Sequence, residues 1–388
     1  MKATEKPVPV PMLDLERQYA PMRQELLEAL AGVLDSRQFI LGGAVEAFEN
    51  AAAEQLGVKH AIGCSSGTDA LWLALAAAGI GPGDAVVTTP FSFFASVSAI
   101  LRAGATPVLA DIDPVTFNLD ANAVQSALVS ERGKNIKAVL PVHLYGQCVG
   151  WTQFDALQKQ HGVKLIEDAA QAWGASWQGI NAGDLGDSAA FSFYPTKNLS
   201  AAGDAGMVST NSDDLAERAR MLRQHGMRRR YYHDEVGWNA RMDGFQGAIL
   251  RVKLNYIAGW NNARRAAAAR YETLFRAAGL AESGPYPQNG IALPREMPGA
   301  HHVWHQYVIR TPRRNELREF LTSRGIGSEI YYPVPLHRQD SLQFLGYKEG
   351  DFPEAERAAR EVLALPIFPE ILEDEQQAVV ASIADFLS

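Results

Sequence analysis

Residues 165–172 read LIEDAAQA, an apolar stretch that ends directly in Glu167 and Asp168 and continues in small residues. This pattern is typical of a buried strand, and a carboxylate at its end must meet a cation, a metal or several donors to tolerate burial. Similar apolar runs alternate with helical patterns on both sides of it. The alternation predicts an α/β fold with a mostly parallel central sheet covered by helices on both faces, where ligands gather at the carboxyl ends of the strands. The expected strands are 85–89, 107–110, 138–142, 164–167, 189–193 and 207–209, and the expected helices are 68–78, 95–102, 121–128, 152–160 and 213–224.

The character of the chain changes at about Asp243. A long helical pattern from Phe245 to about Ala278 is followed by a Pro/Gly-rich passage, 283–299. We expect a large α/β domain over 1–250, with an N-terminal arm, and a smaller α+β domain over 251–388. The expected elements of the second domain are strands at 305–310 and 328–332 and helices at 315–323, 354–362 and 373–386.

Composition excludes several classes of protein. The formal net charge of −8 argues against a broad nucleic-acid-binding surface. The two cysteines, Cys64 and Cys148, have no metal-ligand spacing and are expected to be small buried hydrophobes. The N-terminus has prolines where a signal peptide needs an unbroken apolar core, and the most apolar helical stretch is too short to cross a bilayer. We therefore expect a cytoplasmic protein that does not enter a membrane.

Common cofactor motifs are missing from the sequence. There is no GxGxxG after a strand, no GxxxxGK[ST] and no HExxH, so an NAD-linked oxidoreductase lacks its phosphate loop. His301, His302 and His305 invite a metal interpretation, but no carboxylate follows them at ligand spacing. We expect no metal site.

Three segments together indicate a site that could bind a phosphate and use a buried carboxylate and a lysine. CSSGTDAL, residues 64–71, leads from a turn of small residues into an apolar helix, where Gly67 and Thr68 can hold a phosphate or simply begin the helix. Asp168 can pair with a pyridinium N–H or cap a helix. FSFYPTKNL, residues 191–199, brings a lone lysine, Lys197, close behind a buried strand. Such a lysine is awkward unless it is neutral or used covalently, although a surface lysine in a turn has the same local sequence.

The order of these segments resembles the DegT/DnrJ/EryC1/StrS family of sugar aminotransferases, within the fold type I enzymes that use pyridoxal 5′-phosphate. The resemblance runs from about Leu13 to the end of the chain. The motifs that carry it are SSGTDAL, EDAAQA, FSFYPTKNL, GDAGM, RQHGMRRRYYH, GWNARMDGFQGAIL and YYPVPLH. The family often has glycines near Ser200 and Ala205, which suggests that the loop after Lys197 is less pliable here.

The resemblance implies a role for individual residues of the cofactor site. Lys197 matches the lysine that carries the cofactor and later moves the proton, and Asp168 matches the partner of the pyridinium nitrogen. Gln171 matches the donor to the phenolic oxygen. The positions that match the phosphate site are Gly67, Thr68, Ser192 and Asn239, of which Asn239 comes from the neighbouring subunit.

The resemblance also implies a homodimer with shared active sites, since Arg241 matches a position that approaches the substrate from the same neighbour. One aromatic residue of Phe91-Ser92-Phe93-Phe94 should stack on the pyridine ring. Phe93 fits the family position best, and core packing is the alternative for it.

The family transfers an amino group, usually from L-glutamate with release of 2-oxoglutarate, to a keto group of a nucleotide-linked sugar. Arg229, in the basic and aromatic stretch 228–233, can meet the pyrophosphate or lie in a solvated loop. Tyr331, Tyr332 and His337 match a motif that borders the sugar in relatives. The segment SEIYYPVPLH slightly favours amination at C3 over C4.

Three alternatives remain for the function. An aminotransferase for a cyclitol or benzoquinoid precursor has the same motifs. A dehydratase of the same family replaces the lysine with histidine, so Lys197 argues against it. A non-catalytic regulatory protein with this fold would be marked by loss of Lys197 or Asp168, and both are present.

Overall fold

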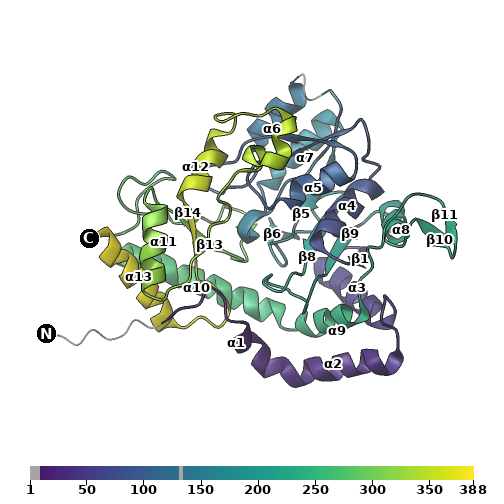
Figure 1. The fold of residues 1–388 in the computed structure, drawn as a ribbon, viewed down its shortest axis with the longest axis horizontal. Coiled ribbons are helices and arrows are strands. Elements are labelled where there is room, and N and C mark those ends of the chain that lie inside the picture. Colours follow the sequence, from purple (N-terminus) through teal and green to yellow (C-terminus); the bar gives the residue numbers. More distant parts are fainter. Residues whose placement is uncertain (1–8, 131–133) are drawn as a thin grey trace.

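The computed structural model describes residues 9–130 and 134–388. The first eight residues, on which the expectation about a signal peptide partly rests, lie outside this part. A seven-stranded sheet with the order β1-β9-β8-β5-β4-β2-β3 forms the centre (Figure 1). Only β9 runs against its neighbours β1 and β8, which confirms the expected mostly parallel α/β sheet. The strands are β1 (His60–Cys64), β2 (Ala85–Thr88), β3 (Thr106–Leu109), β4 (Ile136–Val139), β5 (Lys164–Asp168), β8 (Ser188–Ser192) and β9 (Gly206–Thr210).

Both faces of this sheet are buried because consecutive residues of each strand point to opposite sides. Leu165 and Phe191 pack into one hydrophobic cluster, and their neighbours Ile166 and Ala190 pack into another. The first cluster is covered by α3 (Gly43–Leu56), α6 (Ala121–Val129), α7 (Trp151–His161) and α9 (Gly244–Lys253). The second is covered by α4 (Gly67–Ala77), α5 (Ala95–Arg102) and α8 (Asp213–Leu222).

The C-terminal part packs around α10 (Ile257–Ala277), which runs out of the first cluster into a third. The strand pair β13 (Tyr307–Arg310) and β14 (Val362–Leu365) lies against it, at the left of Figure 1. Val10 pairs with Gly325 and Gly327, so the N-terminal segment joins this part of the molecule. The remaining helices here are α11 (Arg314–Ser323), α12 (Pro353–Glu361) and α13 (Glu373–Leu387).

Shorter elements complete the described structure. Helices α1 (Leu15–Tyr19) and α2 (Arg23–Ser36) lie along the lower edge in Figure 1, and the hairpin β10 (Met227–Arg229) and β11 (Tyr232–His233) projects at the right. Single-turn helical segments occur at Ala20–Met22, Leu144–Gly146 and Leu336–Arg338, with a longer one at Asp340–Leu345, and a small sheet joins β6 (Ser176–Trp177), β7 (Ile180–Asn181) and β12 (Ala300–His301). Within the described ranges, none of the helices has the length and apolarity that a bilayer crossing requires.

Three expectations about elements were wrong. Strand β1 was missed, because its sequence, HAIGC, contains His60 and Gly63 and shows no alternation of polar and apolar residues. The single helix expected from Phe245 to Ala278 is interrupted by a turn at residues 254–256, where Asn255 N–H bonds to the carbonyl of Val252. The strand expected at 328–332 reduces to one bridge between Glu329 and Ala364, and β13 pairs instead with β14, which begins where a helix was expected to end.

Candidate active site

The start of α4 forms a cradle of hydrogen-bond donors at the carboxyl edge of the sheet. The Ser66 hydroxyl caps the helix by accepting from Asp69 N–H at 3.1 Å. The N–H groups of Gly67 and Thr68 and the Thr68 hydroxyl have no partner among the described residues, as expected in the first turn of a helix. Ser192, at the end of β8, lies so close that a Cβ on Gly67 would be 2.5 Å from its Cβ. Free N–H groups at the start of a helix, together with the helix dipole, suit an anion.

Gly206 makes this close approach possible. It begins β9, and a Cβ there would collide with the backbone carbonyl of Ser66. The first residue of β9 must therefore be glycine for the α4 start to lie where it does.

Asp168 ends β5 beside this cradle, in the sheet face covered by α4 and α5. Its side chain is buried, and each carboxylate oxygen accepts one hydrogen bond: Oδ2 from the Ser96 hydroxyl at 2.7 Å and Oδ1 from Ala170 N–H at 3.2 Å. Burial raises the pKa of Asp168, while these two bonds and the nearby charge of Lys197 oppose that shift. A carboxylate has about four acceptor sites, so two remain for a ligand.

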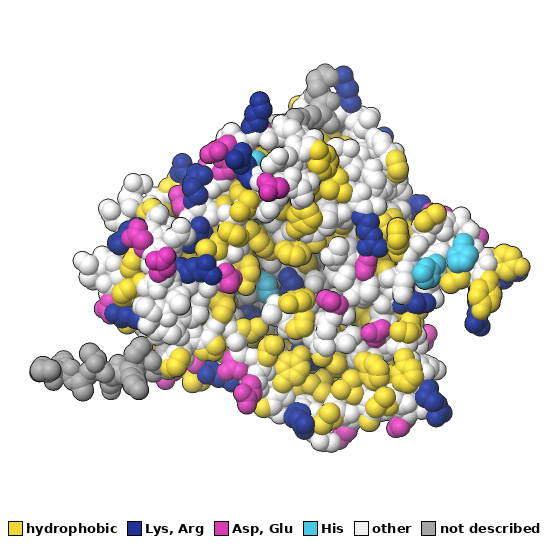
Figure 2. All heavy atoms as spheres, viewed as in Figure 1, with side chains coloured by type: hydrophobic (Ala, Val, Ile, Leu, Met, Phe, Trp, Pro, Cys, Tyr) yellow, Lys and Arg dark blue, Asp and Glu magenta, His cyan; other side chains and the backbone are white. Residues whose placement is uncertain are grey.

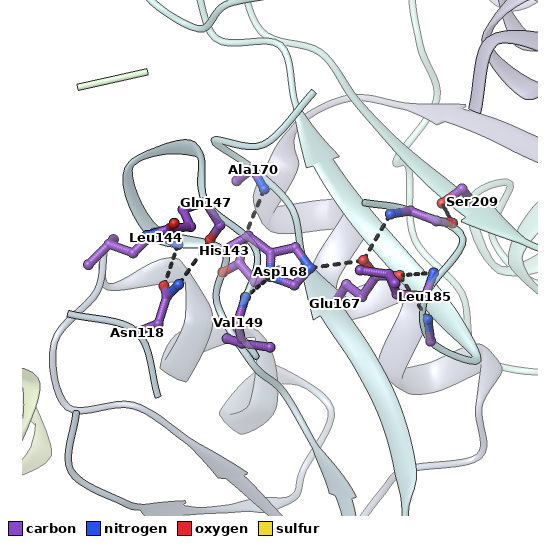
Figure 3. A network of polar contacts seen from close by, with 12 residues as sticks. Asn118, His143, Leu144, Gln147, Val149, Glu167, Asp168, Ala170, Leu185 and Ser209 are labelled. Atoms are coloured by element: carbon purple, nitrogen blue, oxygen red, sulfur yellow. Dashed lines mark hydrogen bonds and ion pairs between the residues drawn. The ribbon is translucent and has the colours of Figure 1, made fainter. Parts of the chain in front are cut away.

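Glu167, the neighbouring residue, points to the other face and has a structural role (Figure 3). Its carboxylate accepts from the N–H groups of Gly183, Leu185 and Gly186 and from His143 Nε2 at 2.9 Å. Val149 N–H donates to His143 Nδ1, so the imidazole proton lies on Nε2 and points to Glu167. Glu167 therefore holds the loop before β8 in place under the site.

Lys197 follows β8 in a tight turn, in which its N–H bonds to the carbonyl of Tyr194 at 2.8 Å. The side chain is partly buried. Burial lowers the pKa of Lys197 to about 8, against the opposing effect of the Asp168 charge. A large share of its amine is therefore neutral near pH 8, as a lysine that reacts with a carbonyl requires.

The residues that follow Lys197 are anchored on two sides. The Asn198 amide donates to Asn261 Oδ1 at 2.9 Å and to the Val303 carbonyl, and its oxygen accepts from His305 Nδ1 at 3.0 Å. Two residues later, the Ser200 hydroxyl contacts Lys253 Nζ at 2.6 Å. The turn that holds Lys197 is thus fixed by the C-terminal helices.

Gln171, Tyr332 and Phe93 border the same region. Gln171 Oε1 accepts from Tyr145 N–H at 2.7 Å, and its Nε2 faces the Tyr332 hydroxyl at 3.5 Å, which leaves an amide hydrogen for a ligand. Phe93 is 59% exposed and its ring lies 6.4 Å from that of Tyr332. Tyr331 touches this group through its backbone, because the Tyr145 hydroxyl donates to its carbonyl.

The His337 side chain is held by residues of the C-terminal part. It is buried, Nε2 bonds to Glu356 Oε1 at 3.0 Å, and its ring packs 4.8 Å from that of Phe352. This arrangement favours a structural role in the C-terminal part over a contact with a sugar.

The predicted residues Asn239, Arg241 and Arg229 lie on or near the surface. Arg241 Nε donates to Asn239 Oδ1 at 3.0 Å, and the segment runs beside the end of β1, with Ser65 N–H bonded to the carbonyl of Ala240. Arg229, on the projecting hairpin, stacks on Tyr232 with its Cζ 3.6 Å from the ring centre. Figure 2 shows aromatic and cationic side chains together on this projection.

The described residues fit pyridoxal 5′-phosphate. The cradle around Gly67 and Ser192 offers phosphate donors, Asp168 offers a carboxylate with free acceptor sites, and Lys197 offers an amine with a lowered pKa.

The family model for DegT/DnrJ/EryC1/StrS aminotransferases matches residues 21–384. The chain belongs to this family. It is an aminotransferase that depends on pyridoxal phosphate.

Two curated relatives and one solved structure illustrate the similarity. A "Pleiotropic regulatory protein" of Geobacillus stearothermophilus is 48% identical, covering 97% of this aminotransferase and 98% of the relative. An Acidithiobacillus ferrooxidans relative named UDP-N-acetyl-3-dehydro-alpha-D-glucosamine 3-aminotransferase is 41% identical, with 96% of each chain covered. The crystal structure of Streptomyces venezuelae DesV in complex with a ketimine intermediate is 41% identical, with a TM-score of 0.92 over 98% of this chain and 99% of that chain.

The histidines considered as metal ligands have other partners in the aminotransferase. His302 Nδ1 accepts from Trp304 N–H at 3.0 Å, and burial lowers its pKa to about 3. His305 is bonded to Asn198. Over residues 9–130 and 134–388, no three histidines, cysteines or acidic residues gather as a metal site.

Several residues around the site of the aminotransferase were not predicted. The Ser96 side chain bonds to Asp168, although it lies far from it in sequence. The Asn198 side chain, next to Lys197 in the chain, bonds to His305, and neither residue carries an unusual local pattern. Glu167 was expected only as a neighbour of Asp168. The period-two pattern of LIEDAAQA, which places the two carboxylates on opposite faces, was the available signal.

Proposed function

We propose that the enzyme transfers an amino group from L-glutamate to the C3 keto group of a nucleotide-linked sugar, in the biosynthesis of amino sugars for polysaccharides or glycosylated metabolites. The observation that carries this proposal is the pair of Lys197 and Asp168 at one sheet edge, beside the cradle formed by Gly67, Thr68 and Ser192. Membership of the aminotransferase family supports it.

The chain's own residues divide the work of the reaction. Bound pyridoxal phosphate supplies an electron sink that stabilises negative charge on the substrate carbon. Ionised Asp168 keeps the ring nitrogen protonated, and the start of α4 binds the phosphate. The Lys197 amine accepts the proton from the α-carbon of glutamate and returns one during the second half-reaction. Its pKa of about 8 suits both transfers near neutral pH. Gln171 orients the ring through the phenolic oxygen, and Phe93 stacks on it.

A homodimer with shared sites is part of the proposal. Exposed apolar side chains gather over α2 and α9 in Figure 2. Leu34, on α2, is 57% exposed, and Phe39, whose ring stacks on that of Phe245 in α9, is 44% exposed. Such a patch supports association with a second copy. In that arrangement Asn239 and Arg241 serve the phosphate and the substrate of the neighbour.

The choice of substrate rests on a relative and on residues outside the cofactor site. The relative from Acidithiobacillus ferrooxidans is named for a UDP-linked sugar aminated at C3. The exposed Arg229, stacked on Tyr232, suits a pyrophosphate and a base, and Tyr331 and Tyr332 border the place for the sugar. An aminotransferase for a cyclitol would have the same cofactor residues.

The test uses glutamate and a panel of nucleotide-linked 3-keto and 4-keto sugars, with 2-oxoglutarate release and product NMR as readouts. We expect turnover with a 3-keto sugar, and loss of at least about 10⁴-fold in the Lys197→Ala variant, since no other amine replaces the covalent partner. Lys159→Ala, an exposed lysine of α7 paired with Asp155, is the control and should retain full activity. Sustained multiple turnover by Lys197→Ala, or turnover of 4-keto sugars alone, would contradict the proposal.

A regulatory function is the second candidate, because the relative that is 48% identical carries that name. The presence of Lys197 and Asp168 favours catalysis. A visible absorbance band that shifts when glutamate is added distinguishes the two, since a protein that only regulates has no reason to react with the amino donor.

A further inference from the structure

Two serine hydroxyls form a line behind Asp168. The Ser96 hydroxyl lies 2.7 Å from Asp168 Oδ2, and the Ser92 hydroxyl lies 3.0 Å from that of Ser96. Ser96 is 1% exposed, and Ser92 and Asp168 are each 4% exposed. The line therefore runs from the loop before α5 to the end of β5 without access to bulk water.

Ionisation of Asp168 fixes the direction of these hydrogen bonds. A carboxylate accepts only, so the single O–H of Ser96 donates to Asp168. Ser96 then has no proton left for Ser92, and Ser92 must donate to Ser96. Each bond polarises the next, which strengthens the donor that reaches the carboxylate. The reverse direction requires a protonated Asp168.

The side chain of Ser96 differs from that of a typical helical serine. Helical serines usually bond to a carbonyl one turn earlier, as Ser98 does on the same helix, with its hydroxyl 3.4 Å from the carbonyl of Ala95. Ser96 instead leaves the helix and reaches another element. Within residues 9–130 and 134–388, its hydroxyl forms hydrogen bonds with Asp168 and Ser92 alone.

Asp168 depends on this donor because its surroundings oppose its charge. Burial in the face packed by α4 and α5 favours the neutral carboxyl, and among the described residues only the Ser96 hydroxyl and Ala170 N–H donate to it. A neutral Asp168 has no charge to offer a protonated ring nitrogen. Ser96 also sets the plane of the carboxylate, because the two donors hold one oxygen each.

We propose that Ser96 is a positioning residue that keeps Asp168 ionised and oriented toward the cofactor's ring nitrogen, and that Ser92 orients Ser96. This rests on the proposed pairing of Asp168 with that nitrogen.

The test compares two probes on the full chain freed of cofactor. One is pyridoxamine 5′-phosphate, which binds without a bond to Lys197, and the other is its carbocyclic analogue with C–H in place of the ring nitrogen. Ser96→Ala should raise the Kd of pyridoxamine phosphate about tenfold, the size of one hydrogen bond to a charged group, and leave the Kd of the analogue within about twofold. Ser96→Thr, which keeps the hydroxyl, should restore the difference between the probes.

Controls separate this proposal from the one on which it rests. Ser98→Ala removes a hydroxyl from the same helix and should change neither Kd. If Asp168→Asn weakens both probes equally, the pairing of Asp168 with the ring nitrogen fails. A different result would overturn only the proposal about Ser96. In that case Asp168→Asn raises the Kd of pyridoxamine phosphate alone, while Ser96→Ala changes the Kd of both probes equally or of neither.

Ser92→Ala provides a second test should Ser96→Ala not fold. It leaves the donor to Asp168 in place but removes its orienting partner. We expect a rise of about two- to threefold in the Kd of pyridoxamine phosphate and no change for the analogue. An unchanged Kd for both probes would overturn the assignment of Ser92.

Discussion

The interior and the exposed parts of the site are built in opposite ways. Asp168 is buried, and side-chain or backbone donors hold both of its oxygens. Arg229 and Asn239 lie on the surface, and their side chains interact with residues close to them in sequence, Tyr232 and Arg241. The interior part is therefore already ordered in one chain, whereas the exposed part needs a ligand or a second chain to define its geometry. Changes inside should alter chemistry, and changes outside should alter binding and assembly.

The largest expected effect distinguishes the roles of two adjacent buried carboxylates, Asp168 in activity and Glu167 in stability. Asp168→Asn should lower kcat/KM about 10³-fold with little change in Tm, because it removes the charge opposite the ring nitrogen. Glu167→Gln should instead lower the free energy of unfolding by about 1–3 kcal/mol, since its new N–H group faces donors. Steady-state kinetics and thermal unfolding of both variants measure this. Loss of activity without loss of stability in Glu167→Gln would contradict the division.

Mixed oligomers test whether the exposed part serves the neighbour. Lys197→Ala and Asn239→Ala chains are each expected to be poorly active alone. When they are refolded together in equal amounts, half of the dimers are mixed and each holds one intact site, so about a quarter of wild-type activity should return. The segment that contains Asn239 also runs beside Ser65, which follows β1 in the same chain. If Asn239 served its own site, no activity would return.

A smaller effect is expected on the projecting hairpin. Arg229→Ala should raise the KM for the nucleotide-linked sugar about tenfold, through loss of one charged hydrogen bond, and leave kcat and the KM for glutamate unchanged. Arg313→Ala is the matched control, because Arg313 is an exposed arginine just before α11 and pairs with Glu316. A fall in kcat with unchanged KM would place Arg229 with the interior part.

The smallest effect concerns stability beneath the Lys197 turn. Lys253 is fully buried, its Nζ contacts the hydroxyls of Tyr19 and Ser200, and burial lowers its pKa to about 7 from 10.5. Between these two pH values the unfolded chain binds a proton that the folded chain lacks, so folding is increasingly favoured as pH rises. The unfolding free energy of the wild type minus that of Lys253→Met should therefore grow by about 1–3 kcal/mol from pH 7 to pH 9. Denaturant titrations measure it, and a difference that falls with pH would contradict the sign.

The sequence predicted the mostly parallel sheet and the positions of Asp168 and Lys197 better than it predicted the residues that hold them in place. Apolar runs that alternate with helices report directly on a sheet buried on both faces. Strand β14 was missed, because the pairing of residues 362–365 with residues 307–310 depends on contacts between distant parts of the chain. Ser96 was missed for the same reason, since its bond to Asp168 spans 72 residues. His337 matched a motif by position, but its direction in the fold is set by Glu356.

Gly206 would stand out in a scan that replaces every residue in turn. Its backbone is not in the left-handed region, so the requirement concerns space and not conformation. The obstructing atoms belong to the main chain of Ser66 and cannot rotate away. Even alanine, the smallest replacement, should thus be rejected at a position that has no side chain to touch a ligand, and such a scan should mark Gly206 as sharply as Lys197.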